Sequence, residues 1–185
     1  MMLITGGVRS GKSTFAEQLA ITQASNLGGQ LQYIATGVPS DKEMRQRIER
    51  HKCERAEGKL AWQTWEKPVH IEALATSFNK NDIVLLDCVT TLLNNEIFSV
   101  SYEWDEAFLE EIYGRILDGI DAIRASCNQL ILVSNEVLYE ALYGNELVIQ
   151  YSRILGNLHQ EIVRRVEKAY LVEAGIPILM KGERG

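Results

Sequence analysis

The chain has 185 residues, enough for one ordinary domain, and its 46% hydrophobic and 24% charged residues are close to the average of globular proteins. Its 19 Lys+Arg against 25 Asp+Glu give a formal net charge of -6, which argues against nucleic acid as the main partner because the field of the molecule repels polyanions. No apolar run approaches the roughly 18 residues of a membrane span, and no basic, apolar leader precedes the first glycine. The three cysteines, Cys53, Cys88 and Cys127, are widely separated, as is typical of a reducing compartment. We therefore expect a cytoplasmic protein without a membrane span.

Short apolar runs alternate with stretches of helical spacing, which predicts one α/β domain over residues 1–185. Such alternation builds a mostly parallel central sheet with helices on both faces. The predicted strands are Met2–Thr5, Leu31–Ala35, Ile83–Leu86, Leu130–Ser134, Ala169–Val172 and Ile176–Met180. The predicted helices cover 12–25, 41–56, 69–78, 102–126 and 150–167. The last two strands straddle Ala174-Gly175, which predicts a C-terminal antiparallel hairpin.

A glycine-rich segment follows the first predicted strand and opens the first predicted helix. It reads Gly6-Gly7-Val8-Arg9-Ser10-Gly11-Lys12-Ser13 and matches G-x-x-x-x-G-K-S, the phosphate-binding loop (P-loop) of NTP hydrolase-like folds. In such a loop the backbone N–H groups point at phosphate oxygens, and the helix N-terminus adds partial positive charge. We expect Lys12 to reach the β and γ phosphates and Ser13 to ligate Mg²⁺. The alternative, a glycine-rich turn without a ligand, is disfavoured by the position between a strand and a helix.

Two acidic residues follow apolar strands at the edge where open α/β sheets bind ligands. Asp87 comes directly after Ile83–Leu86, where a carboxylate can hold Mg²⁺ or its waters, so Asp87 is the preferred metal ligand. The alternative role for Asp87 is to cap the segment that follows. Glu136 stands similarly after Leu130–Ser134 and is the weaker candidate.

The predicted helix 41–56 carries a histidine. Its start has the capping-box pattern Ser40–Glu43, and helical spacing then places His51 on the inward face with Met44 and Ile48. An inward histidine is more often a packed residue than a catalyst. Five cations belong to the same stretch, namely Arg45, Arg47, Arg50, Lys52 and Arg55. They form either a solvated face that pairs with nearby glutamates or a receptor for a triphosphate.

Five segments taken together resemble one enzyme family. They are Leu3–Ser13, Tyr33–Thr36, Glu43–Lys52, Trp62–Glu66 and Leu85–Leu92. The family is the bifunctional adenosylcobinamide kinase/adenosylcobinamide-phosphate guanylyltransferase of cobalamin biosynthesis. Shorter matches that include Ser134–Val137 and Gly175–Pro177 extend the resemblance over nearly the whole chain.

The resemblance implies a kinase that phosphorylates the aminopropanol hydroxyl of adenosylcobinamide with ATP or GTP, with Lys12 in the kinase site. It implies a second step in which GMP passes from GTP to that phosphate through a guanylylated His51. A neutral imidazole, with a pKa of about 6.5, can attack the α-phosphorus. Beside the P-loop, the positions that match GTP-binding residues of the family are Ile34, Ala35, Thr36, Lys52, Cys53, Glu54, Arg55, Glu66 and Asp87. The resemblance also implies a homotrimer with the histidine helix near a subunit interface.

Two departures from the family pattern stand out. After Val137 the chain has Leu138–Asn145, where the family usually has Gly-x-Gly-Ile-Val-Pro, at a place that we expect to shape the corrinoid side. Three residues beyond the usual spacing also stand between Arg55 and Trp62. The first departure leaves open whether both activities are retained, and the second makes the match of Glu66 less secure than that of His51.

Two other functions are compatible with a P-loop. The first is a monofunctional small-molecule kinase in which His51 is structural. The second is a GTPase-like switch or non-catalytic GTP-binding module, for which Asn79–Asp82 offers the N-K-x-D guanine signature. That signature should follow a strand, whereas here it precedes Ile83–Leu86, so the sequence predicts an ordinary turn.

The remaining histidines and tryptophans have less specific patterns. His70 and His159 lack the paired spacing of a metal site, which indicates surface or packing roles. Trp62 and Trp65 could stack on a base or a corrin ring, but large aromatic side chains mostly serve burial, which favours packing.

Overall fold

The computed structural model describes residues 1–38, 42, 45, 46, 49, 55, 60–99, 104–136 and 146–183. Within them a seven-stranded sheet has the order β3-β2-β4-β5-β1-β6-β7. The strands are β1 Met2–Gly6, β2 Gln30–Ala35, β3 Trp62–Glu66, β4 Asp82–Asp87, β5 Gln129–Asn135, β6 Lys168–Glu173 and β7 Ile176–Lys181. Neighbouring strands are parallel except for β6 and β7, which form the expected antiparallel hairpin.

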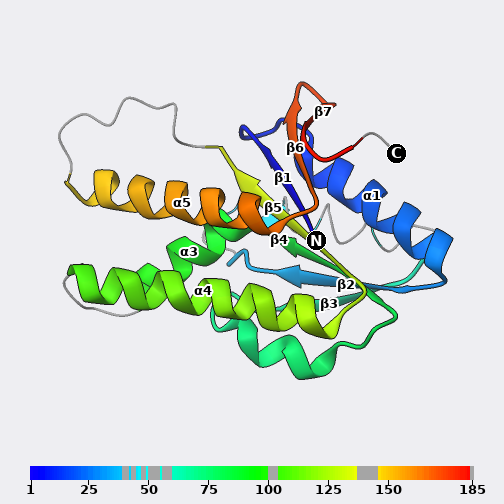
Figure 1. Ribbon diagram of the computed structural model, residues 1–185, viewed down its shortest axis with the longest axis horizontal. Helices are drawn as coiled ribbons and strands as arrows, with labels where there is room; N and C mark the ends of the chain where they lie inside the picture. The colour runs from blue at the N-terminus through cyan, green and yellow to red at the C-terminus, as the bar shows by residue number, and fades with distance from the viewer. Residues whose placement is uncertain are drawn as a thin grey trace.

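Helices cover both faces of the sheet (Figure 1). Helix α1, Lys12–Leu27, lies on one face; α3 Val89–Phe98, α4 Glu106–Ser126 and α5 Glu146–Arg165 lie on the other, where the 3-10 helix η1, Ile71–Ser77, packs against α4. The described members of the predicted helix 41–56 are all helical; they are Lys42, Arg45, Gln46, Glu49 and Arg55. None of the helices in the described part of the chain is long and apolar enough to cross a membrane.

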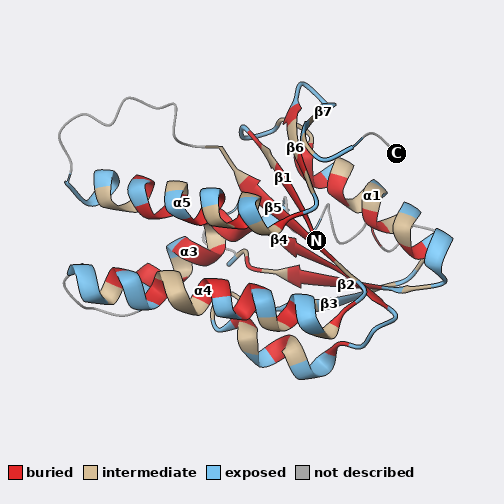
Figure 2. Ribbon diagram, viewed as in Figure 1, coloured by how far each residue is buried: buried red, intermediate tan, exposed pale blue. Residues whose placement is uncertain are grey.

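The two faces bury different kinds of side chain (Figure 2). Helix α1 turns Ala16, Ala20 and Ala24 inward at four-residue spacing, so the helix approaches the sheet closely. The other face is filled by large aliphatic side chains, among them Leu92, Leu93, Ile97, Ile112, Ile116 and Ile120. Each face therefore has its own apolar cluster, separated by the strands.

Two elements are absent from the sequence-based prediction. Strand β3 was missed because it is an edge strand whose polar Gln63, Thr64 and Glu66 break any apolar run. Helix α3 was missed because it follows β4 almost directly and lacks a common N-cap residue. Its cap is Cys88, whose Sγ accepts the Thr91 N–H at 3.4 Å. The predicted helix 69–78 is realised as η1, a 3-10 helix.

The segment Asn79–Asp82 forms the predicted turn. The Asp82 N–H donates to the Asn79 carbonyl at 2.9 Å, and the Asn79 N–H donates to Asp82 Oδ2 at 2.7 Å. This turn leads into the amino end of β4, whereas the P-loop follows the carboxyl end of β1. The segment is thus at the wrong edge of the parallel sheet to read a guanine base in the P-loop.

The two tryptophans of β3 pack against other aromatic rings, as expected. Trp65 donates from Nε1 to Gln32 Oε1 at 2.8 Å and meets the Phe78 ring edge-on at 5.8 Å between centroids. Trp62 meets the Tyr33 ring edge-on at 6.0 Å.

Candidate nucleotide site at the carboxyl edge of the sheet

The P-loop connects β1 to α1 in a tight curl. Gly11 is the N-cap of α1 and has φ 90, a conformation that favours glycine. A Cβ at Gly11 would lie 3.2 Å from Gly175 Cα, and a Cβ at Gly6 would lie 2.4 Å from the Val172 carbonyl oxygen. Both glycines are therefore required by close backbone neighbours as well as by the curl.

The C-terminal hairpin supports the P-loop from outside. The β6–β7 turn has φ 49 at Ala174 and φ 80 at Gly175, two left-handed residues as in a type I′ hairpin turn. The Gly175 N–H donates to the Ser10 carbonyl at 2.8 Å, and the Ser10 N–H donates to the Gly7 carbonyl at 3.2 Å. The hairpin thus fixes the loop conformation, a contact that local sequence pattern does not reveal.

Three polar side chains of the P-loop are buried or partly buried. Lys12 is only 3% exposed, and its Nζ donates to the Gly7 carbonyl at 3.1 Å. Ser13 is buried beside it on the first turn of α1. The Ser10 hydroxyl is buried and has no hydrogen-bond partner among the described residues. Val8 and Arg9 are exposed on the outer side of the loop. A curl of backbone N–H groups with a buried ammonium is suited to bind an anion such as phosphate.

Asp87 ends β4 on the same side of the sheet as α1. Its Oδ2 accepts the Tyr33 hydroxyl at 3.0 Å. Burial raises the pKa of Tyr33 well above its ordinary value, and the negative charge of Asp87 adds to that increase. The phenol therefore keeps its proton and donates it to the carboxylate.

Arg55 packs over this pair from the histidine-bearing segment. Its guanidinium carbon lies 3.7 Å from the centroid of the Tyr33 ring, a cation–π contact. Its NH1 also lies 3.0 Å from Glu17 Oε1 on α1. Arg55 is 7% exposed, so it belongs to the interior beside Asp87 and not to the solvated face of its helix.

The predicted residues of β2 and β3 line up beside Asp87. In the sheet register Ala35 is paired with Glu66 on one side and with Asp87 on the other, so the three form one row at the carboxyl edge. Glu66 is exposed, whereas Ile34 is fully buried in the core on the α3–α4 face. Thr36 Oγ1 accepts the Cys88 N–H at 2.7 Å and donates to the Cys88 carbonyl at 2.9 Å. The side chains of Ile34 and Thr36 are thus committed to the fold.

The Cys88 thiol is buried between β4 and α3. Burial raises the pKa of this thiol, and the adjacent charge of Asp87 raises it further. Cys88 therefore remains a neutral cap of α3 and is not a nucleophile.

Several predicted residues lie outside the described residues. These are His51, Lys52, Cys53 and Glu54, together with the departing loop Leu138–Asn145. Glu136, the weaker acidic candidate, directly follows β5, and its N–H donates to the Gly6 carbonyl at 2.9 Å. This bond places Glu136 beside the beginning of the P-loop.

Ser13 and Asp87 offer the kind of ligands that Mg²⁺ prefers. A hydroxyl and a carboxylate are hard oxygen donors, and Mg²⁺ usually completes its shell with phosphates and water. Over the described part of the chain, no group of three or more His, Cys, Asp or Glu could hold an ion by itself. The residues present therefore fit a metal that arrives with a nucleotide.

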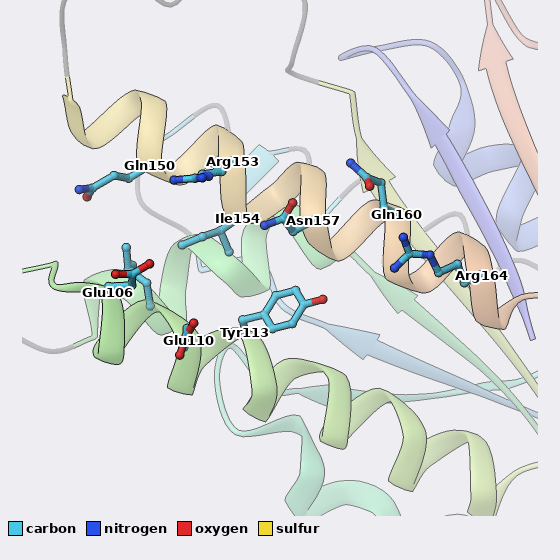
Figure 3. A pocket seen from close by; sticks show the side chains of 10 residues that line it. Glu106, Glu110, Tyr113, Gln150, Arg153, Ile154, Asn157, Gln160 and Arg164 are labelled. Atoms are coloured by element: carbon cyan, nitrogen blue, oxygen red, sulfur yellow. The ribbon is translucent and has the colours of Figure 1, made fainter.

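A groove of about 650 Å³ lies elsewhere, between α4 and α5 (Figure 3). Its walls mix acidic residues of α4, such as Glu106 and Glu110, with Arg153 and Arg164 of α5. Because α4 and α5 cover the face opposite α1, this groove is separate from the P-loop.

Solved structures with a similar fold include a P-loop ATPase domain and a protein of related architecture. The ATPase domain has a TM-score of 0.54 and 13% identity, covering 100% of this chain and 77% of that one. A Pyrococcus horikoshii OT3 protein, the structural study of Project ID PH0250, has a TM-score of 0.52 and 9% identity, covering 100% and 87%. At such low identities the likeness shows the fold alone, and the expected P-loop fold is confirmed.

Curated proteins similar in sequence carry one name. "Bifunctional adenosylcobalamin biosynthesis protein CobU" of Escherichia coli K12 is 35% identical over 98% of this chain and 99% of its own length. The CobU of Salmonella typhimurium LT2 is likewise 35% identical, and CobP of Pseudomonas aeruginosa PAO1 is 33% identical over 98% of this chain and 97% of its own length. Residues 2–180 match the family profile described as "Cobinamide kinase / cobinamide phosphate guanyltransferase". The chain therefore belongs to this CobU family, and the resemblance inferred from its motifs is confirmed.

Proposed function

We propose that this chain phosphorylates adenosylcobinamide with ATP or GTP and then transfers GMP from GTP to the phosphorylated product. The observation that carries the proposal is the buried Lys12 inside a complete P-loop, at the same sheet edge as Asp87, in a chain of the CobU family. We further propose that it works as one domain over residues 1–185, as a homotrimer, and in the cytoplasm.

In the kinase step, the backbone N–H groups of Gly6–Gly11 hold the triphosphate. The acceptor hydroxyl oxygen forms a bond to the γ-phosphorus while the bond to the β–γ bridging oxygen breaks, and the nucleoside diphosphate leaves. Lys12 neutralises the charge on the transferred group. Mg²⁺, held by Ser13 and Asp87, supplies further charge neutralisation when it is bound. Tyr33, by donating to Asp87, orients that carboxylate.

In the guanylyltransferase step, a nitrogen of neutral His51 attacks the α-phosphorus of GTP, and pyrophosphate leaves. A phosphate oxygen of the phosphorylated cobinamide then displaces the histidine. Arg55 supports this location, because it follows His51 by about one helical turn and is itself buried beside Tyr33 and Asp87.

The other residues of the proposed nucleotide site act around these two centres. Lys52, Cys53, Glu54 and Arg55 belong to the histidine segment, and Glu66 belongs to the end of β3. Because the side chains of Ile34 and Thr36 are packed, we propose that the segment 34–36, Ala35 included, contributes through its backbone.

The test is to incubate the chain with Mg²⁺ and GTP labelled at the α or the γ phosphate, followed by mass spectrometry of the denatured protein. We expect α-label on the wild type and none on His51→Asn. His70→Asn is the matched control, because His70 is an exposed histidine outside the site. Equal labelling of wild type and His51→Asn would assign the adduct to another residue. Phosphorylation of adenosylcobinamide without any adduct would leave the monofunctional kinase.

A further inference from the structure

Strand β5 lies between the two strands that carry the kinase residues. Its neighbours are β1, which leads into the P-loop, and β4, which ends in Asp87. In the sheet register Asn135 is paired with Gly6, the last residue of β1. The end of β5 is therefore inserted between Lys12 and Asp87, although no sequence motif marks it.

The alternation along β5 decides which side chain faces the nucleotide. Ile131 and Val133 belong to the core on the α1 face, and Leu130 and Leu132 belong to the core on the other face. Asn135 continues the first series, so its amide lies on the face that carries the P-loop.

Local contacts agree with that placement. The Asn135 Nδ2 lies 3.8 Å from Cys88 Sγ, a weak hydrogen bond. The Lys12 ammonium is near enough to the same thiol to oppose the rise in its pKa. The Asn135 amide and the Lys12 ammonium thus both lie beside the residue that follows Asp87.

On the opposite face, a buried hydrogen-bonded chain holds this end of β5. The Ser134 Oγ lies 2.7 Å from His159 Nε2 on α5 and 2.8 Å from Thr90 Oγ1 on α3. Thr90 Oγ1 also accepts the backbone N–H of Asn135 at 2.8 Å. Thr90, Ser134 and His159 are each at most 8% exposed.

This chain does more than satisfy buried polar groups. Buried polar groups need partners, and a chain in which each member has one fixes a single local arrangement. It ties β5 to α3 and α5, and its last bond ends on the backbone of Asn135 itself. Apolar residues could fill the same space without orienting that peptide.

We propose that Asn135 donates its side-chain N–H to the γ-phosphate of the bound nucleotide, and that Thr90, Ser134 and His159 are positioning residues that hold Asn135 in place. The amide stabilises charge on an equatorial oxygen during transfer, in the manner of a fixed oxyanion donor. The acceptor in this step rests on the proposed function; the contact with the γ-phosphate does not.

The first experiment measures nucleotide binding without any acceptor. With Mg²⁺ present, we expect Asn135→Ala to weaken binding of an imido-bridged GTP analogue by about 10-fold and binding of GDP by less than about 2-fold. Asn128→Ala is the matched control, because Asn128 is an exposed asparagine immediately before β5 at its other end. Unchanged binding of both nucleotides, or an equal loss for both, would overturn the γ-phosphate contact.

The second experiment measures phosphoryl transfer to adenosylcobinamide. We expect Asn135→Ala to lower kcat by about 10²-fold, as removal of one oxyanion donor does in other enzymes. We expect Ser134→Ala to lower kcat by about 10-fold while KM for the nucleotide stays within about 2-fold. A merely structural role would lower the melting temperature of Ser134→Ala and leave kcat per folded molecule unchanged, and that result would overturn the positioning role.

A pair of variants at His159 separates hydrogen bonding from packing. His159→Gln keeps a polar atom for Ser134, whereas His159→Leu removes it. We expect the Gln variant to retain several-fold more kcat than the Leu variant, and equal kcat values would overturn the positioning role of His159. If the wild type does not phosphorylate adenosylcobinamide, the proposed function fails, and the binding experiment alone decides this inference.

Discussion

The two faces of one sheet are built for different tasks. On the α1 face, alanines let the helix lie close to the strands, and the polar Tyr33, Asp87 and Asn135 gather at the carboxyl edge beside the P-loop. On the α3–α4–α5 face, large aliphatic side chains fill the core, and its buried polar chain ends on the backbone of Asn135. The comparison teaches that one face carries the chemistry while the other supplies the stability and orients the first.

The largest effect that sharpens this comparison is expected at Lys12. Lys12→Ala removes the buried ammonium of the P-loop, so we expect phosphoryl transfer to fall by about 10³-fold. Stabilisation by Mg²⁺ and GTP, about 2.7 kcal/mol at 100 times the Kd, should shrink in the same variant. Single-turnover transfer and thermal unfolding with nucleotide measure the two effects.

The control for this variant is Lys80→Ala. Lys80 stands at the opposite edge of the sheet, where its Nζ donates to the Ala125 carbonyl. Loss of transfer in the control as well as in Lys12→Ala would show that both variants act through folding and would remove the distinction between the two faces.

The second largest effect is expected in the core of the other face. Ile112→Ala should lower the free energy of unfolding by about 2–5 kcal/mol, because it leaves a cavity in a fully buried aliphatic cluster. Urea denaturation measures this loss. We expect kcat per folded molecule to stay within about 2-fold, and a larger drop at full folding would contradict the division between the faces.

A smaller effect is expected where the hairpin meets the P-loop. Gly11→Ala puts a side chain at φ 90 and sets its Cβ 3.2 Å from Gly175 Cα, so we expect a loss of about 1–2 kcal/mol. The variant should also bind GTP more weakly, because the loop must move away from the hairpin. Gly114→Ala is the control: that glycine lies inside α4 with open space around it, and there Ala should stabilise the helix slightly. Unchanged unfolding and binding in Gly11→Ala would contradict the strain.

The sequence predicted the parts of the site that depend on local pattern. The P-loop is one continuous motif between a strand and a helix, and Asp87 follows a strongly apolar strand, so periodicity located both. The alternation of strands and helices also predicted the sheet with its C-terminal hairpin.

The parts that escaped prediction depend on which strands are neighbours. Periodicity does not show that β5 is inserted between β1 and β4, so it pointed to Glu136 as an acid and overlooked Asn135. His159 was expected only as a surface or packing residue, and its bond to Ser134 joins residues 25 positions apart. The available signal was a polar Ser134-Asn135 pair at the end of an otherwise apolar strand.

The smallest expected effect is a pH dependence that comes from the supporting face. Burial lowers the pKa of His159 from its ordinary value of 6.5, while the negative charge of Glu136 opposes that shift. The unfolded chain therefore binds the proton more readily than the folded chain. Stability is complete above a pH of about 6.5 and falls as the pH decreases from there toward the lower pKa of the folded state.

Replacing the histidine tests this sign. In His159→Gln the proton-binding group is gone, so we expect the loss of stability between about pH 7.5 and pH 5.5 to be smaller than in the wild type, by less than about 1.4 kcal/mol for each unit of pKa shift. Urea denaturation at the two pH values measures the difference, and His70→Gln, at an exposed histidine, should leave it unchanged. An identical loss in His159→Gln and the wild type would mean that His159 titrates alike in both states. The hydrogen bond to Ser134 would then not depend on a neutral ring, and protonation would not uncouple the supporting face from Asn135.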